Sequence, residues 1–420
     1  VDSNTFKTDD PLQYELVSTN TSTNGKIIPN ISKTDITGTS IELGSGHFVK
    51  ANNAKHTYEL KIYYPKKTTS QNTNQGAAFS AHVEITSAKA PTVSNLAETI
   101  LASNEVKTPI TTPGAAVSTA SEALLASTED DYGTSYYFRG AVTNNYVEFA
   151  NKCWRIVRVG GDGSVKLILH NDNPTGAANP CDAANNSASA AFARYSGTTY
   201  KSAFNANYND NAYVGFKFGT VGSSTYEATH ANTNKSTILT NLETWYNNNL
   251  KTYESVIDDN VWCNDKTNVT DTTYVPWVWT PNGYGYGKNV TYYGATQRLV
   301  SKNNSAGGTG PSLKCNGELS KINSKVGLIT ADELALAGYA YAKENTTTYL
   351  QENATDILWW SLSPCFFNGN NANVWSAGGS SGLFGSNGVS SSLGVRPSIS
   401  LKPSTNATGD GTSENPYVVD

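Results

Sequence analysis

The sequence contains no methionine, few charged residues and no long apolar run. Charged side chains make up 15% of the 420 residues and the net charge is −5, so no basic surface is expected. Nucleic acids and anionic membranes attract clusters of lysine and arginine, which argues against either as a partner. No stretch approaches the roughly 20 apolar residues that cross a bilayer, so we expect no membrane span in the mature chain. The absence of methionine, with valine at position 1, predicts a processed polypeptide.

Cysteine and histidine are scarce and scattered, with five of each and no Cys-x-x-Cys pair. Zinc ligation is therefore not expected, and nothing in the sequence indicates a cofactor or another metal. One or two disulfides are expected in an extracellular setting, and we favour Cys263 with Cys315 because the polar segments around both would gain most from a cross-link. The odd number leaves a thiol that is free or bonded between chains. The alternative is that all five are small buried hydrophobic residues.

Asparagine, threonine, serine, glycine and tyrosine are abundant instead. A polar surface with little charge is common in secreted proteins that interact through amides, hydroxyls and rings. Tracts rich in asparagine can also be disordered, but the 24 tyrosines and 8 tryptophans recur along the chain and favour a folded protein. We therefore predict an extracellular location at a cell surface.

The order of patterns predicts a mainly β protein with an α+β part. Residues 1–88 alternate between apolar and polar, most clearly over 56–64 and 78–85, which predicts a β-sandwich domain. Residues 89–130 contain a short helix-like segment and several prolines, and are interpreted as a connecting segment. Residues 131–420 form the larger domain, in which strands over 136–169 precede helices.

Two helices in the larger domain have clear sequence signals. Residues 236–250 carry apolar side chains at helical spacing, and Thr330 with Glu333 predicts a capping box. The glycines over 160–163 predict a hairpin turn between two of the strands. These embedded helices favour an α+β domain over a doubly wound sheet.

A glycine-rich and asparagine-rich segment dotted with aromatic residues follows the pair Trp359 and Trp360. No carboxylate, histidine, lysine or cysteine lies between Asn368 and Leu393. Amides and hydroxyls for hydrogen bonding, glycines for irregular backbone and a few rings are the composition of a recognition loop, which favours binding over catalysis. The predicted ligand-binding residues are Asn368, Asn370, Asn371, Asn373, Trp375, Phe384, Ser386 and Asn387.

Catalytic and metal sites were weighed against simpler explanations. The adjacent acids at 130–131, 258–259 and 332–333 are explained by turns and by the helix cap, so a glycosidase pair is not favoured. His170 and His230 are expected in surface loops without a partner, and Cys365 is expected to be packed because no activating cation is evident. Calcium ligation by Asp162, Asp410 and Glu414 is less favoured than a turn role. We expect no catalytic residue and no metal.

A second aromatic segment spans residues 275–287, with rings at Trp277, Trp279, Tyr284 and Tyr286. Exposed rings of this kind stack on sugars or pack against a neighbouring subunit. The same rings could instead cap the core. The sequence favours neither interpretation.

Several motifs in the last 300 residues together resemble an uncharacterised domain common in surface proteins of Gram-positive gut bacteria. That domain is similar to the C-type-lectin-like fold shared with formylglycine-generating enzymes and with variable proteins diversified by retroelements. The resemblance implies a ligand-displaying surface near 366–392 and no known reaction. The motifs are Asp130–Gly140, Trp154–Arg158, Trp262–Asp265, Leu328–Glu333, Trp360–Pro364, Gly394–Pro397 and Gly409–Tyr417.

The first domain, through residues 56–62 and 71–76, resembles the β-domain that often precedes this module. Such domains in bacterial surface fibres polymerise by donating an extended strand, and Val1–Val17 is the donor candidate here. An ordinary first strand is the simpler interpretation of the same residues. We therefore expect a subunit of a fibre or pilus-like appendage with an adhesive head that binds a host or bacterial surface glycan or protein. The alternatives are a monomeric lectin-like adhesin and an enzyme acting on surface glycans or peptides.

Overall fold

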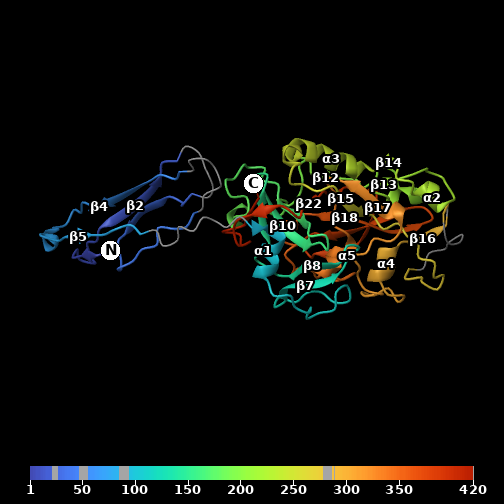
Figure 1. Ribbon diagram of the computed structural model, residues 1–420, viewed down its shortest axis with the longest axis horizontal. Coiled ribbons are helices and arrows are strands. Elements are labelled where there is room, and N and C mark those ends of the chain that lie inside the picture. The colour runs from blue at the N-terminus through green and yellow to red at the C-terminus, as the bar shows by residue number, and fades with distance from the viewer. Residues whose placement is uncertain (21–26, 47–54, 85–93, 278–285, 288, 420) are drawn as a thin grey trace. The chain divides into compact units, whose positions relative to one another are not determined.

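The computed structural model describes residues 1–20, 27–46, 55–84, 94–277, 286–287 and 289–419. The chain folds into two compact units, Val1–Thr92 and Val93–Asp420. Both are mainly β, with several sheets and few helices (Figure 1). Within the described ranges, no helix is both long enough and apolar enough to cross a membrane.

The smaller unit contains a three-stranded antiparallel sheet in the order β3-β2-β4 and a separate pair of short strands, β1 and β5. Leu12, Tyr14 and Leu16 are buried while the residues between them are partly exposed, so the alternation in the sequence produces the central strand. The segment Val1–Val17 thus supplies most of β2, which is paired on both sides within its own chain. The elements are β1 (Ser3–Asn4), β2 (Gln13–Ser18), β3 (Ile31–Asp35), β4 (Tyr58–Tyr63), η1 (Asn72–Asn74) and β5 (Phe79–Ser80).

The first sheet of the larger unit combines strands from both ends of that unit. Its order is β22-β11-β10-β8-β7, and β9 pairs with both β10 and β24. The strands predicted over 136–169 all belong to it, and Gly163, at a φ of 81°, closes the hairpin between β10 and β11. The strands are β7 (Ala123–Glu129), β8 (Thr134–Gly140), β9 (Tyr146–Phe149), β10 (Lys152–Val159), β11 (Val165–Asn171), β22 (Ser398–Leu401) and β24 (Tyr417–Val418).

The second sheet is built around one long buried strand, β18, which contains Trp359 and Trp360. Its order is β12-β21-β18-β19-β20, and β16 pairs with the end of β18. The strands are β12 (Lys201–Ser202), β16 (Val290–Tyr292), β18 (Leu358–Asn368), β19 (Ala372–Gly378), β20 (Leu383–Gly388) and β21 (Leu393–Gly394). Shorter pairs are β13 (Lys217–Phe218) with β14 (Asn234–Lys235), β15 (Asn260–Cys263) with β17 (Lys321–Ser324), and β6 (Ser94–Asn95) with β23 (Asn406–Ala407).

Short helices lie around the sheets; in the view of Figure 1, α3 lies above β12 and β22, and α4 lies below β16. Both helices predicted in the larger domain are present. Ser236 caps α3 by accepting the N–H of Leu239, and Thr330 and Glu333 form the capping box of α5. The elements are α1 (Leu96–Ser103), η2 (Ala183–Asn185), η3 (Asn211–Val214), α2 (Tyr226–Thr229), α3 (Thr237–Asn249), η4 (Lys251–Tyr253), α4 (Gly294–Leu299), η5 (Glu318–Ser320) and α5 (Ala331–Ala337).

The segment 89–130, interpreted from the sequence as a connection, is a structural part of the larger unit from α1 onward. Leu96 and Ile100 of α1 are fully buried in the main core, and β7 pairs along its length with β8. Arg139 is completely buried and forms an ion pair with Glu122 at 2.9 Å, which ties this segment to the first sheet. The prolines that suggested a linker lie in the turns between α1 and β7.

Two disulfides stabilise the larger unit. One joins Cys263 to Cys315, the pair favoured from the sequence, and the other joins Cys153 to Cys181, a pair that no sequence pattern marks. Cys365 is a free thiol buried in β18. Cross-links across 28 and 52 residues remove conformational freedom from the unfolded chain and so stabilise the fold.

Candidate functional site

The segment predicted as a recognition loop is a β-hairpin in the second sheet. Strands β19 and β20 pair over six positions, from Asn373 opposite Gly388 to Gly378 opposite Leu383. The glycines that suggested irregular backbone lie largely at the hairpin turn, where Gly378, Gly379 and Gly382 have positive φ angles of 103°, 68° and 61°. A Cβ at position 378 would approach the Trp359 indole to 2.5 Å, so glycine is required for packing as well as for backbone conformation.

Two of the predicted ligand-binding residues are inside the protein, which corrects the expectation that the rings of this segment are exposed. Trp375 and Phe384 are both 0% exposed. Their rings pack against each other at a centroid distance of 4.8 Å, and Trp375 also contacts the ring of Tyr341. Burial of such large apolar side chains stabilises the sheet more than the same side chains would if they faced solvent.

The predicted asparagines either form hydrogen bonds that stabilise the strands and turns or lie at exposed positions. Asn368 begins the turn between β18 and β19, where its side-chain oxygen accepts the N–H groups of Asn370 and Asn371 at 3.1 and 2.8 Å. Asn387 donates to the Ser376 hydroxyl at 2.7 Å. Much of this hydrogen bonding therefore stabilises the hairpin, and only the side chains of Asn370 and Asn371 belong to exposed residues.

Two of the predicted residues, Phe384 and Ser386, line an apolar depression, which we call the aromatic groove. Cross-strand pairing places Phe366 opposite Asn373 and Trp375 opposite Ser386, so these side chains share one face of the sheet. The groove has a volume of about 380 Å³. It is lined by Trp277, Tyr341, Ala342, Phe366, Leu383, Phe384, Gly385 and Ser386.

The rings of the aromatic groove are held in place by contacts with one another. Trp277 lies 5.1 Å from Phe366 and 6.1 Å from Tyr341 between ring centroids, and its indole N–H donates to the Tyr341 hydroxyl at 3.2 Å. That hydroxyl donates in turn to Asn304 at 2.9 Å. Burial raises the pKa of Tyr341, so the ring stays neutral at physiological pH. Leu383 is 44% exposed and forms the solvent side of the groove.

The charge of the groove limits what it can bind. None of the described residues that line it is charged. An anionic or cationic ligand would lose its hydration there without gaining an ion pair, whereas a neutral ligand with an apolar face would gain contact with the rings. Residues 278–285 of the second aromatic segment, which include Trp279 and Tyr284, lie outside the described residues. Tyr286 of the same segment is buried, and its hydroxyl lies 2.8 Å from Nε2 of His230.

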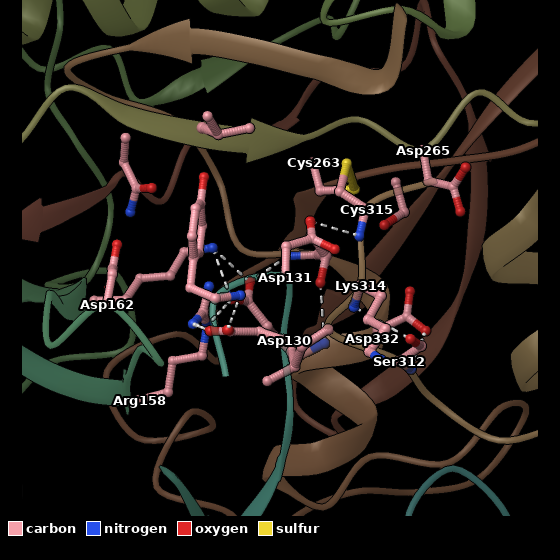
Figure 2. Close-up of a pocket in the computed structure, with 18 of the residues that line it drawn as sticks. Asp130, Asp131, Arg158, Asp162, Cys263, Asp265, Ser312, Lys314, Cys315 and Asp332 are labelled. Atoms are coloured by element: carbon pink, nitrogen blue, oxygen red, sulfur yellow. Dashed lines mark hydrogen bonds and ion pairs between the residues drawn. A yellow bond between two sulfur atoms is a disulfide. The ribbon is translucent and has the colours of Figure 1, made fainter. Parts of the chain in front are cut away.

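A second pocket, the charged pocket, lies between the first sheet and the helices α4 and α5 and is shown in Figure 2. Its volume is about 40 Å³. The Cys263–Cys315 disulfide lies in its wall, and Asp131 accepts the N–H of Cys315 at 3.1 Å. Space of this size holds ordered water but excludes a sugar ring.

Most carboxylates of the charged pocket are already used in ion pairs, and Asp131 and Asp162 accept backbone N–H groups instead. Glu333 accepts from Lys166 at 2.7 Å and from Arg158 at 3.0 Å. Arg158 also pairs with Asp130 at 3.0 Å (Figure 2). Burial alone would raise the pKa of Glu333, but the charges of Lys166 and Arg158 outweigh it and lower the pKa to about 2. Glu333 is therefore ionised at neutral pH and cannot act as a general acid.

A second ion-pair cluster extends the same network. Arg298 of α4 bonds Asp332 at 2.6 Å and Asp265 at 2.8 Å. These pairs link α4, α5 and the segment after β15, which are far apart in the sequence. Because the members come from separate segments, no local motif could have revealed the pocket. We read its charges as a structural network that orders the unit.

The remaining candidates for chemistry are buried. His170 and His230 are both 0% exposed, which corrects the expectation of surface loops. Burial first, and neighbouring positive charges second, lower the pKa of each well below its usual range, so both rings are neutral. Cys365 is 1% exposed and burial raises its pKa to about 12, which leaves no reactive thiolate at neutral pH. In the described part of the chain, no three histidine, cysteine, aspartate or glutamate residues cluster as metal ligands would.

The comparisons with known proteins add no relative to this description. Models of protein families, curated proteins and solved structures all gave no match to the chain. The functional assignment therefore depends on the geometry of the aromatic groove and on the sequence motifs.

Proposed function

We propose that the chain is an extracellular surface protein whose larger unit binds a neutral glycan in the aromatic groove. The observation that carries the proposal is the groove itself, where the partly exposed rings of Trp277 and Tyr341 pack on buried rings and no lining residue that the structure describes is charged. Its volume of about 380 Å³ falls at the lower end of the roughly 300–1,000 Å³ of small-molecule sites. A site of this size fits one or two sugar rings.

A glycan suits the groove better than an apolar metabolite. One face of a sugar ring carries C–H groups that pack on aromatic faces, while its hydroxyls need hydrogen-bond partners. The groove offers rings at Trp277 and Tyr341, the hydroxyl of Ser386 and the backbone at Gly385. Rigid aromatic side chains lose little conformational entropy on binding, which favours recognition at modest cost.

Two disulfides support the extracellular location. Such bonds persist in oxidising compartments and are rare where thiols are kept reduced. The sequence motifs further support a bacterial surface protein with a β-sandwich as its first domain and a C-type-lectin-like fold in its larger unit. A host or bacterial surface glycan is the partner class that follows.

Binding without catalysis is the better supported activity. Asp130, Asp265, Asp332 and Glu333 of the charged pocket form ion pairs, Asp131 and Asp162 accept backbone N–H groups, and the histidines and Cys365 are sealed in the core. An enzyme acting on glycans or peptides needs a carboxylate or nucleophile that reaches substrate. A hydrolysis assay on any glycan that binds tests this alternative, because turnover abolished by one carboxylate substitution would favour an enzyme.

A glycan array probed with the full chain, followed by titration calorimetry, tests the proposal. Leu383→Asp places a carboxylate at the mouth of the groove, and we expect the Kd of a neutral glycan to rise at least about tenfold because the charge loses hydration on binding. Val221→Asp is the matched control, since Val221 is 45% exposed, close to Leu383 at 44%, and does not line the groove. The proposal fails if no neutral glycan binds, or if both variants bind like the unmodified chain.

The fibre role is a further proposal about the same protein. Donation of Val1–Val17 to a neighbour would first require β2 to leave both β3 and β4, which pair with it inside the unit. Electron microscopy of the native preparation tests it directly. Regular filaments that disappear when residues 1–17 are deleted would support donation, and dispersed particles would count against it.

A further inference from the structure

The outer edge of β4 is open in the smaller unit. β2 pairs with one side of β4 over six residues, and no described strand pairs with the other side. Edge strands expose a row of backbone donors and acceptors that can pair with a further strand. The opposite edge of the sheet is β3, whose residues after Ile31 are polar and exposed.

The backbone pattern shows which residues face the open edge. Thr19 donates its backbone N–H to the carbonyl of Thr57 across the pair. Because hydrogen-bonded positions alternate in an antiparallel pair, Glu59 and Lys61 also direct their backbone groups toward β2. The backbone N–H and C=O groups of Tyr58, Leu60 and Ile62 therefore point away from β2.

The side chains at the same edge form an incompletely covered apolar row. Leu60 lies opposite Leu16 and Ile62 opposite Tyr14, so all four share the face of the sheet that forms the core. Leu16 and Tyr14 are 4% and 8% exposed, but Leu60 and Ile62 are 38% and 43% exposed. The core face therefore continues to the edge of the sheet without a covering strand among the described residues.

We propose that β4 pairs antiparallel with β4 of a second copy of this chain, about a two-fold axis at Leu60. In this register Glu59 lies opposite the partner's Lys61, and Lys61 lies opposite the partner's Glu59. Tyr58 and Ile62 exchange the outward backbone hydrogen bonds, and the two Leu60 side chains meet on the core face. This proposal goes beyond glycan binding and does not depend on it.

Charge and backbone pattern together select this register. A shift of one residue would place the outward backbone groups of one β4 opposite residues whose backbone groups point toward their own β2, so no hydrogen bonds could form. A shift of two residues centres the axis on Lys61 and places two like charges directly opposite each other, which is destabilising. The register centred on Leu60 converts the exposed pair of Glu59 and Lys61, 3.0 Å apart within one strand, into two further opposite-charge pairs between copies.

The pairing joins two glycan-binding units in one particle. An interface made by a single strand pair is at the small end of specific interfaces, so a weak and concentration-dependent dimer is expected. On a surface that carries many copies of a glycan, two linked sites bind with higher avidity than either site alone. Weak pairing is therefore sufficient for a functional effect.

Sedimentation equilibrium of the full chain at low salt, up to roughly 0.5 mM, tests the pairing, because weak interfaces need high concentration. Glu59→Lys and Lys61→Glu each create two like-charge pairs, and each should raise the dimer Kd at least about tenfold. An equimolar mixture of the two variants restores both opposite-charge pairs, so it should associate as strongly as the unmodified chain. Glu42→Lys, at an exposed position outside the strands of the smaller unit, makes the same change of charge as Glu59→Lys and is the control that should leave the Kd unchanged.

Each outcome decides the proposal. Dimerisation that is lost in both single variants and regained in their mixture supports it. A chain that stays monomeric overturns it, and so does a dimer that neither variant weakens. A dimer that Lys61→Glu leaves as strong as the unmodified one, and that becomes stronger when this variant is mixed with the unmodified chain, overturns the proposed register in favour of the one centred on Lys61. Circular dichroism of each variant verifies the fold, which the exposed ion pair affects little.

Discussion

Replacement of Trp375 by alanine tests whether the β19–β20 hairpin is part of the packed core or a surface that contacts ligand. The side chain is 0% exposed and its ring centroid lies 4.8 Å from Phe384 and 5.8 Å from Tyr341. Its indole N–H has no hydrogen-bond partner among the described residues, so the lost stability comes from apolar burial and from the cavity left behind. Replacement of a buried aromatic residue by alanine costs about 3–5 kcal/mol.

The measurement is differential scanning calorimetry of the full chain, in which the larger unit is followed by its own transition. A unit of this size loses roughly 2 °C of Tm per kcal/mol, so Trp375→Ala should melt roughly 6–10 °C below the unmodified protein. Trp375→Phe keeps most of the buried volume and should melt between the two. Asn371→Ala, at an exposed position in the turn before β19, should change the free energy of unfolding by less than about 0.5 kcal/mol.

The opposite result would refute the reasoning. If Trp375→Ala melts like the unmodified chain but no longer captures glycan, then the ring contacts ligand and the hairpin is a recognition loop, as its composition suggested. A loss of Tm in Asn371→Ala equal to that in Trp375→Ala would also contradict the assignment, because it would place the turn in the core.

Three further outcomes follow from the buried groups. The pKa of Glu333 in the folded protein is lowered from 4.5 to about 2, so its contribution to stability is complete above pH 4.5 and is lost as the pH falls toward 2. The Tm measured over this range should therefore fall less steeply for Glu333→Gln than for the unmodified protein. Equal slopes would count against the ion pairs. Mild reduction followed by alkylation should label Cys263 and Cys315 first, because they are partly exposed, whereas Cys153 and Cys181 are at most 1% exposed. Mass spectrometry gives the order of labelling, and the reverse order would contradict the burial. Cys365 should resist alkylation at pH 8 until the larger unit unfolds, because burial raises its pKa to about 12, and fast labelling in the native protein would disprove that.

Local patterns predicted the helices and the first sheet well. Residues 236–250 carry apolar residues on one face and a serine at the start, and they form α3 with Ser236 as its cap. Thr330 and Glu333 form the predicted capping box. Strands over 136–169 have apolar residues in dense runs bounded by turn residues, and they form β8 to β11. In these cases the signal lies within a few consecutive residues.

The β19–β20 hairpin was missed because its composition is unusual for strands. Asparagine, serine and glycine have low β propensity, and β19 is buried on both faces, so no simple alternation marks it. Its aromatic residues Trp375 and Phe384 were predicted to contact ligand, but both pack inward, and only Phe384 lines the groove. The chain could not show this, because the partners of Trp375 are Tyr341 and Phe384, and Tyr341 lies 34 positions earlier.

The rest of the site could not be predicted because its residues are far apart in the sequence and close only in the folded protein. The charged pocket brings Asp130 together with Glu333, and the second disulfide depends on the approach of Cys181 to β10. Neither follows from spacing along the sequence. The buried histidines were misplaced for the same reason, since their partners are distant in the chain: Nε2 of His170 lies 3.1 Å from the Asn353 amide, and Nε2 of His230 lies 2.8 Å from the Tyr286 hydroxyl.

The pairing of β6 with β23 has a mechanical consequence. Asn95 donates its side-chain amide to the carbonyl of Pro403, and the N–H of Leu96 donates to Thr405, at the point where the chain enters the larger unit. Tension arriving from the first residues is thus transmitted to β22 to β24 and the first sheet, while the β19–β20 hairpin belongs to the second sheet. Tension applied to the amino-terminal part of the molecule would therefore load these hydrogen bonds and the first sheet before it loads the second sheet, to which the hairpin belongs.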